Sequence, residues 1–397
     1  MARRQRDAPA LADHTVRIFS GIQPTGRKHL GNYIGAIAQY ISSQERGEGV
    51  FCIVDLHAII GDYDPAELRE RVHDTTATLL AAGLDPERCI LFRQSDVPEH
   101  TELTWLLSSI TELGRLQRMH QFRDKSLAQR ELVSAGLLMY PVLQAADVLA
   151  YRAHEVPVGE DQREHLELMR DVARRFNSRF GGEREVLIVP EHRIPEVGAR
   201  IMDLQDPMSK MSTTGGSEQG TVYVLDDPAS IEKKLKSAVT DSGSEIVRSP
   251  EKPGVSNLIE ILAAVRAVNP AVIENELEQA RYGELKGAVA TAVIDYLAPV
   301  RERYEQLRDD QEALEAILRD GARERGDLLL AHRGRPGGPL APATPFMRLL
   351  RPSLQRRARG AAQWPRRRSS RSRSRRSSPA GSSPPRRICR ARAGRTG

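Results

Sequence analysis

The sequence predicts an α/β protein: a parallel sheet with a helical insertion, followed by a helical C-terminal domain and a disordered basic tail. Three observations lead to this fold class. Short runs rich in valine, isoleucine and phenylalanine alternate with helical patterns over the first hundred residues or so, as in strand–helix–strand crossovers. Helical patterns dominate from about residue 102 to 180 and again from residue 230 onward. Past residue 330 the chain turns to arginine, serine, proline and glycine, which cannot bury enough surface to fold.

The predicted strands are short apolar runs of the kind that lie buried in a parallel sheet. They are Val16–Ser20, Val50–Leu56, Arg88–Gln94 and Val186–Val189. The chain has 397 residues, of which 40% are apolar and 28% charged, so we expect two or three domains with sizeable cores.

The first strand runs into a glycine-containing turn, Gly21 to Gly26, and then into a helix that starts near His29. A strand, a glycine turn and a helix start form a typical phosphate site, because backbone N–H groups there are unpaired and the helix dipole favours an anion. The spacings of the dinucleotide fingerprint and of the Walker A loop are both missing. From these residues alone, phosphate binding and a plain turn with a helix cap both remain open.

A polar stripe crosses an otherwise apolar helix that we expect to follow Pro141. Tyr140, Gln144, Asp147 and Tyr151 fall at spacings that place their polar ends on one face. Polar groups within an apolar helix need partners. The stripe is therefore either a structural hydrogen-bond network or the wall of a pocket that binds an amphipathic ligand.

Two further segments carry chemistry. The segment from Val156 to Gln162 enters a helix with acidic residues at its start, which also suit the helix dipole. The segment from Asp206 to Gly216 has the composition of a mobile loop, with Lys210 among hydroxyls and glycines. A phosphate turn, a polar pocket and a lysine loop together suit the binding of ATP beside a small molecule.

The net charge of +6 is the sum of an acidic segment, residues 1–330, and a strongly basic segment, residues 331–397. Residues 331–397 hold 19 arginines, no lysine and no acid, which leaves 40 basic against 53 acidic residues in the first 330.

No apolar run is long enough for a membrane helix or a signal peptide, so we expect a cytoplasmic protein without a membrane partner. The spacing of Cys52, Cys89 and Cys389 suits buried thiols rather than a zinc site or a disulfide framework.

Several motifs resemble those of class I aminoacyl-tRNA synthetases, and most closely the bacterial tryptophanyl-tRNA synthetases. The resemblance covers about residues 16 to 325. Its motifs are SGIQPTG, PTGRKHLGN, FCIVDLHAI, YPVLQAAD, VGEDQ, EVGARIM, SKMST and IEKKLKSAVTDS. In the family's terms, His29 to Asn32 match the HIGH signature and Lys210 to Thr214 match the KMSKS loop.

The resemblance implies a domain organisation and an activity. A Rossmann-like catalytic domain would span residues 15–205, with its helical insertion at about 102–180. The KMSKS-type loop and C-terminal helical domain would span 206–326, between an N-terminal arm at 1–14 and the tail at 327–397. The family activates L-tryptophan with ATP and Mg²⁺ and transfers it to tRNA(Trp), as a homodimer and without a permanently bound cofactor or a resident metal.

The resemblance also implies roles for individual residues. The catalytic residues would be His29, Asn32 and Lys210. ATP would contact Gln23, Pro24, Thr25, Gly31, Asn32, Gly159, Glu160, Asp161, Ile201, Lys210, Met211, Ser212, Thr213 and Thr214. Tryptophan would contact Phe19, His57, Tyr140, Gln144, Asp147, Val156, Val158 and Gln162, with Asp147 accepting the indole N–H.

This sequence departs from the family pattern at three places. Thr213 stands where the family has its second loop lysine, and Gln144 stands where many bacterial relatives have methionine. The third departure is the tail, which reads either as a nucleic-acid-binding extension or as a frameshifted segment. Two alternative functions remain: a tyrosyl-tRNA synthetase-like enzyme, since a carboxylate accepts from O–H as readily as from N–H, and a catalytically weak RNA-binding or regulatory paralogue.

The acidic body requires that tRNA binding use local basic patches. Lys233, Lys234 and Lys236 form the strongest candidate patch in the sequence.

Overall fold

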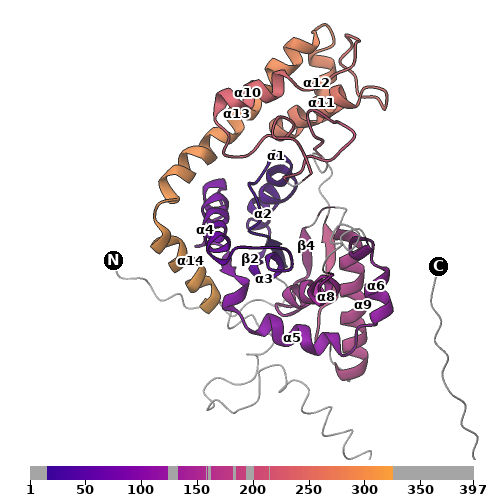
Figure 1. The fold of residues 1–397 in the computed structure, drawn as a ribbon, viewed down its shortest axis with the longest axis vertical. Coiled ribbons are helices and arrows are strands. Elements are labelled where there is room, and N and C mark those ends of the chain that lie inside the picture. Colours follow the sequence, from indigo (N-terminus) through magenta and orange to yellow (C-terminus); the bar gives the residue numbers. More distant parts are fainter. Residues whose placement is uncertain are drawn as a thin grey trace, which may run out of the picture. The chain divides into compact units, whose positions relative to one another are not determined.

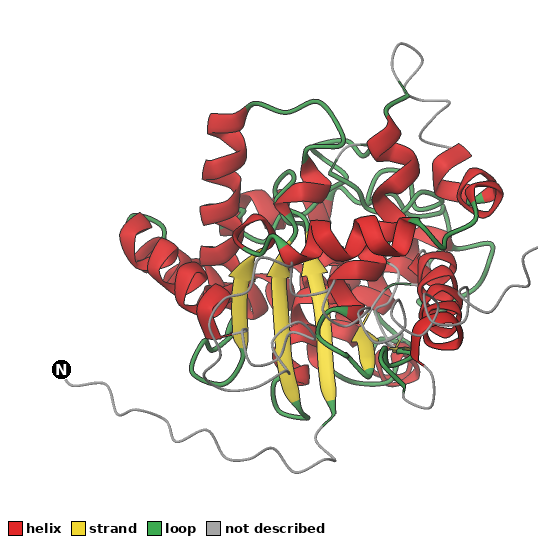
Figure 2. Cartoon of the chain, turned by 90° about the horizontal axis from the view of Figure 1, so that it is seen from below, coloured by secondary structure: helices red, strands yellow, loops and turns green. Residues whose placement is uncertain are grey.

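The computed structural model describes residues 16–123, 133–157, 159, 162–181, 185–193, 201–213 and 215–324, and for residues 192 and 193 it describes the backbone only. These residues form a five-stranded parallel sheet with the order β3-β2-β1-β4-β5. The strands are β1 (Arg17–Ile22), β2 (Glu48–Ile53), β3 (Ile90–Arg93), β4 (Glu155–Pro157) and β5 (Glu191–Arg193). Figure 2 shows strands running in one direction among the helices. The predicted α/β fold is confirmed, while the arm at 1–14 and the tail at 327–397 lie outside the described residues.

Helices connect the first three strands. They are α1 (Leu30–Asn32), a π-helical turn (Tyr33–Ile37), α2 (Ala38–Ser43), α3 (Asp55–Ala58) and α4 (Pro65–Ala82). The Asp64 carboxylate caps α4 by accepting from the N–H groups of Ala66 and Glu67, and Gly83, at φ 112°, ends it. Local capping chemistry thus sets both ends of the helix between β2 and β3.

Among the described residues from 94 to 181, the regular structure is helical apart from the short strand β4. It holds a 3₁₀ turn (Gln94–Asp96), α5 (Glu99–Ser108), α6 (Leu113–Arg118), α8 (Ala135–Leu149), α9 (Arg163–Phe176) and a π-helical turn (Asn177–Gly181). Helix α8 packs between α5 and α9 (Figure 1). It begins six residues before Pro141, so the expected start after the proline is wrong; the Ser134 hydroxyl caps α8 by accepting from the N–H of Leu137.

The C-terminal helices are α10 (Pro228–Lys236), α11 (Pro253–Arg266), α12 (Pro270–Glu276), α13 (Tyr282–Leu307) and α14 (Gln311–Glu324). The long α13 contacts α4, α10 and α11. Helix α14 packs along β3, an edge strand, so closely that a Cβ on Gly321 would lie 1.9 Å from the carbonyl oxygen of Leu91. No single helix among the described residues is long and apolar enough to cross a membrane, and the bent pair α11–α12 passes that test by length and composition only.

The sheet separates two hydrophobic cores. Along β2, Phe51 and Ile53 pack with the C-terminal helices, whereas Val50 and Cys52 pack with α5, α8 and α9. This alternation follows from the two-residue period of a strand. The sheet is therefore packed on both faces by apolar side chains.

One predicted strand is wrong and two strands were missed. Residues 186–189 are not a strand, because the side-chain amide of Asn177 binds this segment: its Oδ1 accepts from the N–H groups of Val186 and Leu187, and its Nδ2 donates to the carbonyl of Leu187. Strand β5 follows instead at Glu191–Arg193. Strand β4, at Glu155–Pro157, lies within the segment where helical patterns were expected to dominate.

Candidate active site

One cavity of about 720 Å³ lies at the carboxyl ends of β1 and β4. The strand order changes direction between these two strands, and the crevice at such a switch point is the usual ligand site of an open α/β sheet. We call it the strand-end cavity. The predicted site residues that line it are Phe19, Gln23, His29, Gly31, Asn32, His57, Tyr140, Gln144, Asp147, Val156, Gly159, Gln162, Lys210, Met211 and Ser212.

Other predicted residues lie elsewhere. Pro24, Thr25, Ile201 and Thr213 are not among the residues that line the cavity. Ile201 is buried behind Gly31, where its Cβ would lie 3.5 Å from a Cβ added at that glycine. Val158, Glu160, Asp161 and Thr214 lie outside the described residues.

The start of α1 is capped by its own side chains. The His29 Nδ1 accepts from the N–H of Asn32, and the Asn32 Oδ1 accepts from the N–H of His29. The N–H of Leu30 donates to the carbonyl of Val222 at 2.8 Å. These backbone N–H groups are therefore already paired, contrary to the expectation of unpaired donors. The groups that the turn presents to the cavity include the imidazole of His29 and the side chain of Asn32.

Two buried basic side chains have lowered pKa values at this turn. Burial, with the nearby charges of Lys210 and Lys28, lowers the pKa of His29 to about 4, so its ring is neutral at pH 7. Burial also lowers the pKa of Lys28 to about 8, against the attraction of Asp74. The Nζ of Lys28 donates to the carbonyls of Gln23 at 2.7 Å and Thr25 at 3.1 Å, which fixes the turn from behind.

Backbone hydrogen bonds hold the lysine loop in place. The N–H of Met211 donates to the carbonyl of Ile201, and the N–H of Asp203 donates to the carbonyl of Ser209. Met211 is buried in the core, while the exposed Lys210 lines the cavity near His29. Thr213 Oγ1 donates to the carbonyl of Arg27 at 3.0 Å. The segment expected to be a mobile loop is thus attached at both ends.

The polar stripe on α8 forms both a network and a pocket wall. Asp147 is 2% exposed, and its Oδ1 accepts from Gln94 Nε2 at 2.7 Å and contacts His100 Nδ1 at 2.6 Å. Its Oδ2 contacts His57 Nε2 at 2.8 Å. Burial raises the pKa of Asp147, but the contacts with His100 and His57 outweigh burial and lower it to about 2. Asp147 is therefore an ionised acceptor in the cavity at neutral pH.

Other members of the stripe have partners as well. The hydroxyl of Tyr140 donates to Gln121 Oε1 at 3.0 Å and lies 2.9 Å from His165 Nε2, and burial raises its pKa to about 12. The Nε2 of Gln144 donates to Gln162 Oε1 at 3.2 Å. The hydroxyl of Tyr151 contacts His100 Nε2 at 2.8 Å, below the cavity rather than in its wall.

Sequence reasoning missed Gln94, His100, Gln121 and His165. The first two follow β3, and a polar residue after the carboxyl end of a parallel strand is a signal that could have been used. For Gln121 and His165 the sequence offers no comparable signal.

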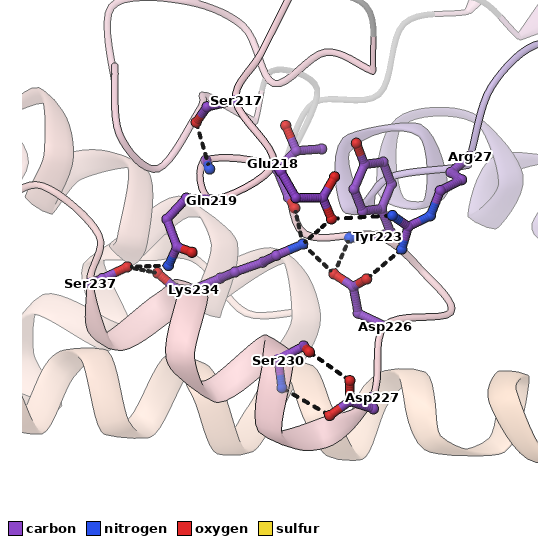
Figure 3. A network of polar contacts seen from close by, with 12 residues as sticks. Arg27, Ser217, Glu218, Gln219, Tyr223, Asp226, Asp227, Ser230, Lys234 and Ser237 are labelled. Carbon is purple, nitrogen blue, oxygen red and sulfur yellow. Dashed lines mark hydrogen bonds and ion pairs between the residues drawn. The ribbon is translucent and has the colours of Figure 1, made fainter.

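Only part of the predicted basic patch, Lys233, Lys234 and Lys236, is exposed for binding tRNA. Lys234 is 6% exposed, and its Nζ donates to Asp226 Oδ2 and to the carbonyl of Thr221, both at 2.8 Å (Figure 3). Its buried ion pair removes it from any tRNA surface, so this part of the expectation is wrong. Lys236 lies on the surface and pairs with Glu232.

The cavity is poor in carboxylates for a metal ion. Among the described residues, Asp147 is the one acid in its wall, and it already has three partners. The described residues also contain no group of three or more His, Cys, Asp or Glu side chains placed to hold a metal. The described residues therefore do not fit a protein-bound Mg²⁺.

Comparisons with known proteins agree on one group. The family "tRNA synthetases class I (W and Y)" matches residues 11–298. The "Tryptophan–tRNA ligase 2" of Streptomyces avermitilis is 48% identical over 315 residues, covering 79% of this chain and 93% of that protein.

Two solved structures are also similar. The tryptophanyl-tRNA synthetase of Mycoplasma pneumoniae has a TM-score of 0.72 and 35% identity, covering 79% of this chain and 94% of its own. That of Campylobacter jejuni, solved with ADP and tryptophan, has a TM-score of 0.65 and 29% identity, covering 87% and 100%.

Proposed function

The chain belongs to the class I tRNA synthetases for tryptophan and tyrosine and is a tryptophan–tRNA ligase, and we propose that the strand-end cavity is its active site. The carboxylate of L-tryptophan attacks the α-phosphorus of ATP, diphosphate leaves, and the tryptophanyl group passes to the 3′-terminal adenosine of tRNA(Trp). The observation that carries the assignment is that the HIGH-type turn, the lysine loop and the polar stripe all line one cavity.

In this proposal, catalysis consists of positioning and charge stabilisation. His29, Asn32 and Lys210 meet the negative charge on the leaving diphosphate. The neutral imidazole of His29 can donate from Nε2, because its Nδ1 accepts from Asn32. An Mg²⁺ bound to ATP would supply further positive charge at the phosphate oxygens.

The remaining nucleotide contacts follow the family pattern. Gln23 contacts ATP from the turn, with Thr25 beside it at the edge of the site. Gly159 to Asp161 hold the adenosine, and Ile201 supports that side from behind Gly31 rather than from the cavity wall. Pro24, Gly31, Met211, Ser212 and Thr214 keep the ATP contacts that the resemblance implies. Thr213, whose hydroxyl donates to the Arg27 carbonyl, is not in the cavity wall and supports the loop instead.

Asp147 accepts the indole N–H in the proposed tryptophan complex. Its low pKa keeps it ionised, and an ionised carboxylate can only accept. An indole N–H only donates and fits such a group, whereas a phenol hydroxyl also needs a donor of its own. Tyr140 and Gln162 receive the ammonium group, and Gln144, bound to Gln162, orients that amide. Phe19, His57, Val156 and Val158 complete the pocket.

We also propose a cytoplasmic homodimer that binds tRNA(Trp). The support for self-association is Trp105 on α5, whose side chain is 79% exposed. Exposed tryptophan is uncommon on a surface that stays in water and is enriched at interfaces. Sedimentation of Trp105→Ser at micromolar concentration tests this point, because a monomer is expected where the unchanged protein is dimeric.

Amino-acid-dependent ATP–diphosphate exchange tests the function. With each of the twenty amino acids in turn, we expect exchange with tryptophan and background rates with the others, followed by charging of tRNA(Trp). Exchange that favours tyrosine would identify the tyrosyl alternative. Tight RNA binding without exchange would identify a catalytically weak paralogue and refute the assignment.

A further inference from the structure

Arg27 connects the turn after β1 to the segment that follows Lys210, through both its backbone carbonyl and its guanidinium. It lies in the glycine turn, directly after Gly26, whose φ is +60°. Its backbone carbonyl accepts from Thr213 Oγ1 at 3.0 Å. Its guanidinium donates to Asp226 Oδ1 at 2.7 Å and to Glu218 Oε1 at 3.2 Å, and stacks 3.7 Å from the centre of the Tyr223 ring (Figure 3).

The partners of this guanidinium are themselves fixed. The Asp226 side chain is 5% exposed, and its Oδ2 accepts from the N–H of Tyr223 and from Lys234 Nζ. Lys234 also donates to Glu218 and to the carbonyl of Thr221. Two cations, Arg27 and Lys234, therefore face two anions, Asp226 and Glu218. Arg27 docks mainly on the buried carboxylate of Asp226, which other hydrogen bonds already hold.

Thr213 fits closely against the same turn. Its Cγ2 lies 2.6 Å from the position of a Cβ added at Gly26, so the threonine methyl occupies the space that the glycine leaves. Thr213 stands three residues after Lys210, and Glu218 follows five residues later. The chain on the carboxyl side of Lys210 is thus held to the turn twice, once by the Arg27 carbonyl and once by its guanidinium.

We propose that Arg27 is a positioning residue that sets the place of Lys210 relative to His29. Its guanidinium is not among the groups that line the strand-end cavity, and its charge is matched by Asp226 and Glu218. It therefore acts through the loop and not on the phosphates. This inference rests on the proposed function of the cavity, and it gives Thr213 a docking role in place of the missing lysine charge.

The test compares Arg27→Gln with a matched control. Arg266→Gln removes another arginine from a 2.8 Å pair, with Glu276, at similar exposure and outside the cavity. In ATP–diphosphate exchange we expect Arg27→Gln to lower kcat by about tenfold with the KM for tryptophan within twofold, because a misplaced Lys210 affects the transition state and not the indole pocket. Arg27→Lys should restore part of the rate, since one ammonium can pair with Asp226 but cannot span both acids. Glu218→Gln, at a 67% exposed side chain, should give a smaller loss without a folding defect.

A second readout does not depend on catalysis. Hydrogen exchange of the amides of residues 201–213 should be faster in Arg27→Gln than in the unchanged protein, and unaltered in Arg266→Gln. Equal kcat and equal exchange in the two glutamine variants would overturn the proposal, as would an increased KM for tryptophan with an unchanged kcat. If the unchanged protein shows no tryptophan-dependent activity, the proposed function fails, and amide exchange alone still decides whether Arg27 holds the loop.

Discussion

Asp147→Ala is expected to lower the stability of the fold, and not only the affinity for tryptophan. The substitution removes the acceptor of Gln94 Nε2, His57 Nε2 and His100 Nδ1, and all three residues are 7% exposed or less. A buried donor without a partner costs about 1–3 kcal/mol. The network therefore predicts a loss of roughly 3–9 kcal/mol in the free energy of unfolding, against a total of about 5–15 kcal/mol for typical proteins.

The pH dependence of stability at acid pH gives a separate measure, the contribution of the ionised Asp147 carboxylate to the free energy of unfolding. A folded-state pKa of about 2, below the usual 3.8, favours folding wherever the carboxylate is ionised in both states. This contribution, roughly 2 kcal/mol, is fully present above pH 4 and is lost as the pH falls through about 2. Asp147→Ala should lack this part of the acid dependence.

Urea unfolding at pH 7, followed by circular dichroism, measures the effect. Asp171→Ala is the matched control, because Asp171 makes only surface ion pairs on α9. Asp147→Asn keeps the shape and one acceptor, so it should stay folded and raise the KM for tryptophan by roughly tenfold or more. A loss below about 1 kcal/mol in Asp147→Ala, no larger than that of the control, would refute the argument from the buried network.

Three further predictions concern the phosphate side of the site and the tail. Lys210→Ala should lower kcat for tryptophan activation by about 2–4 kcal/mol of transition-state stabilisation and leave the KM for tryptophan unchanged in steady-state exchange; full activity would make Lys210 a bystander. The folded-state pKa of His29 is about 4, below the usual 6.5, so its ring signals in NMR should stay constant from pH 8 to 5. The contribution of His29 to the free energy of unfolding should be present above pH 6.5 and lost as the pH falls through about 4. An NMR titration midpoint near 6.5 would contradict the argument from burial. The last prediction applies if the intact mass of the native protein shows that the cell makes residues 331–397. Deleting them should then leave exchange activity intact but reduce the salt dependence of RNA binding. Equal slopes of log affinity against log salt for the two proteins would show that the arginines do not bind RNA.

The parts of the site that the sequence predicts are those encoded in local pattern. The turn after β1, the stripe of α8 and the lysine loop each follow from spacing within a short segment, and all three line one cavity. The three longest strands were found because buried parallel strands are continuous apolar runs. Strand β4 was missed because three residues give no period to recognise.

Partners distant in sequence could not be predicted. His100 lies 47 residues and Gln94 lies 53 residues from Asp147, and no local pattern records such a pairing. A different limit applies to Lys234: Asp226 lies only eight residues away, but no sequence pattern shows that the loop before α10 brings the two side chains together. The wrong strand at residues 186–189 has a similar cause, since the side-chain amide of Asn177, nine or ten residues away, binds this backbone, and hydrophobicity does not reveal such a contact.

The contact between α14 and β3 has a consequence for how the protein is made. Strand β3 ends at Arg93, and the helix that packs along it begins at Gln311, about 220 residues later. At synthesis rates of about 5–20 residues per second, the edge of β3 stays uncovered for roughly 10–40 seconds. An uncovered strand edge is a template for pairing with another chain. The nascent protein therefore has a period during which a chaperone, or a slower rate of initiation that spaces the ribosomes on the messenger, would improve its yield.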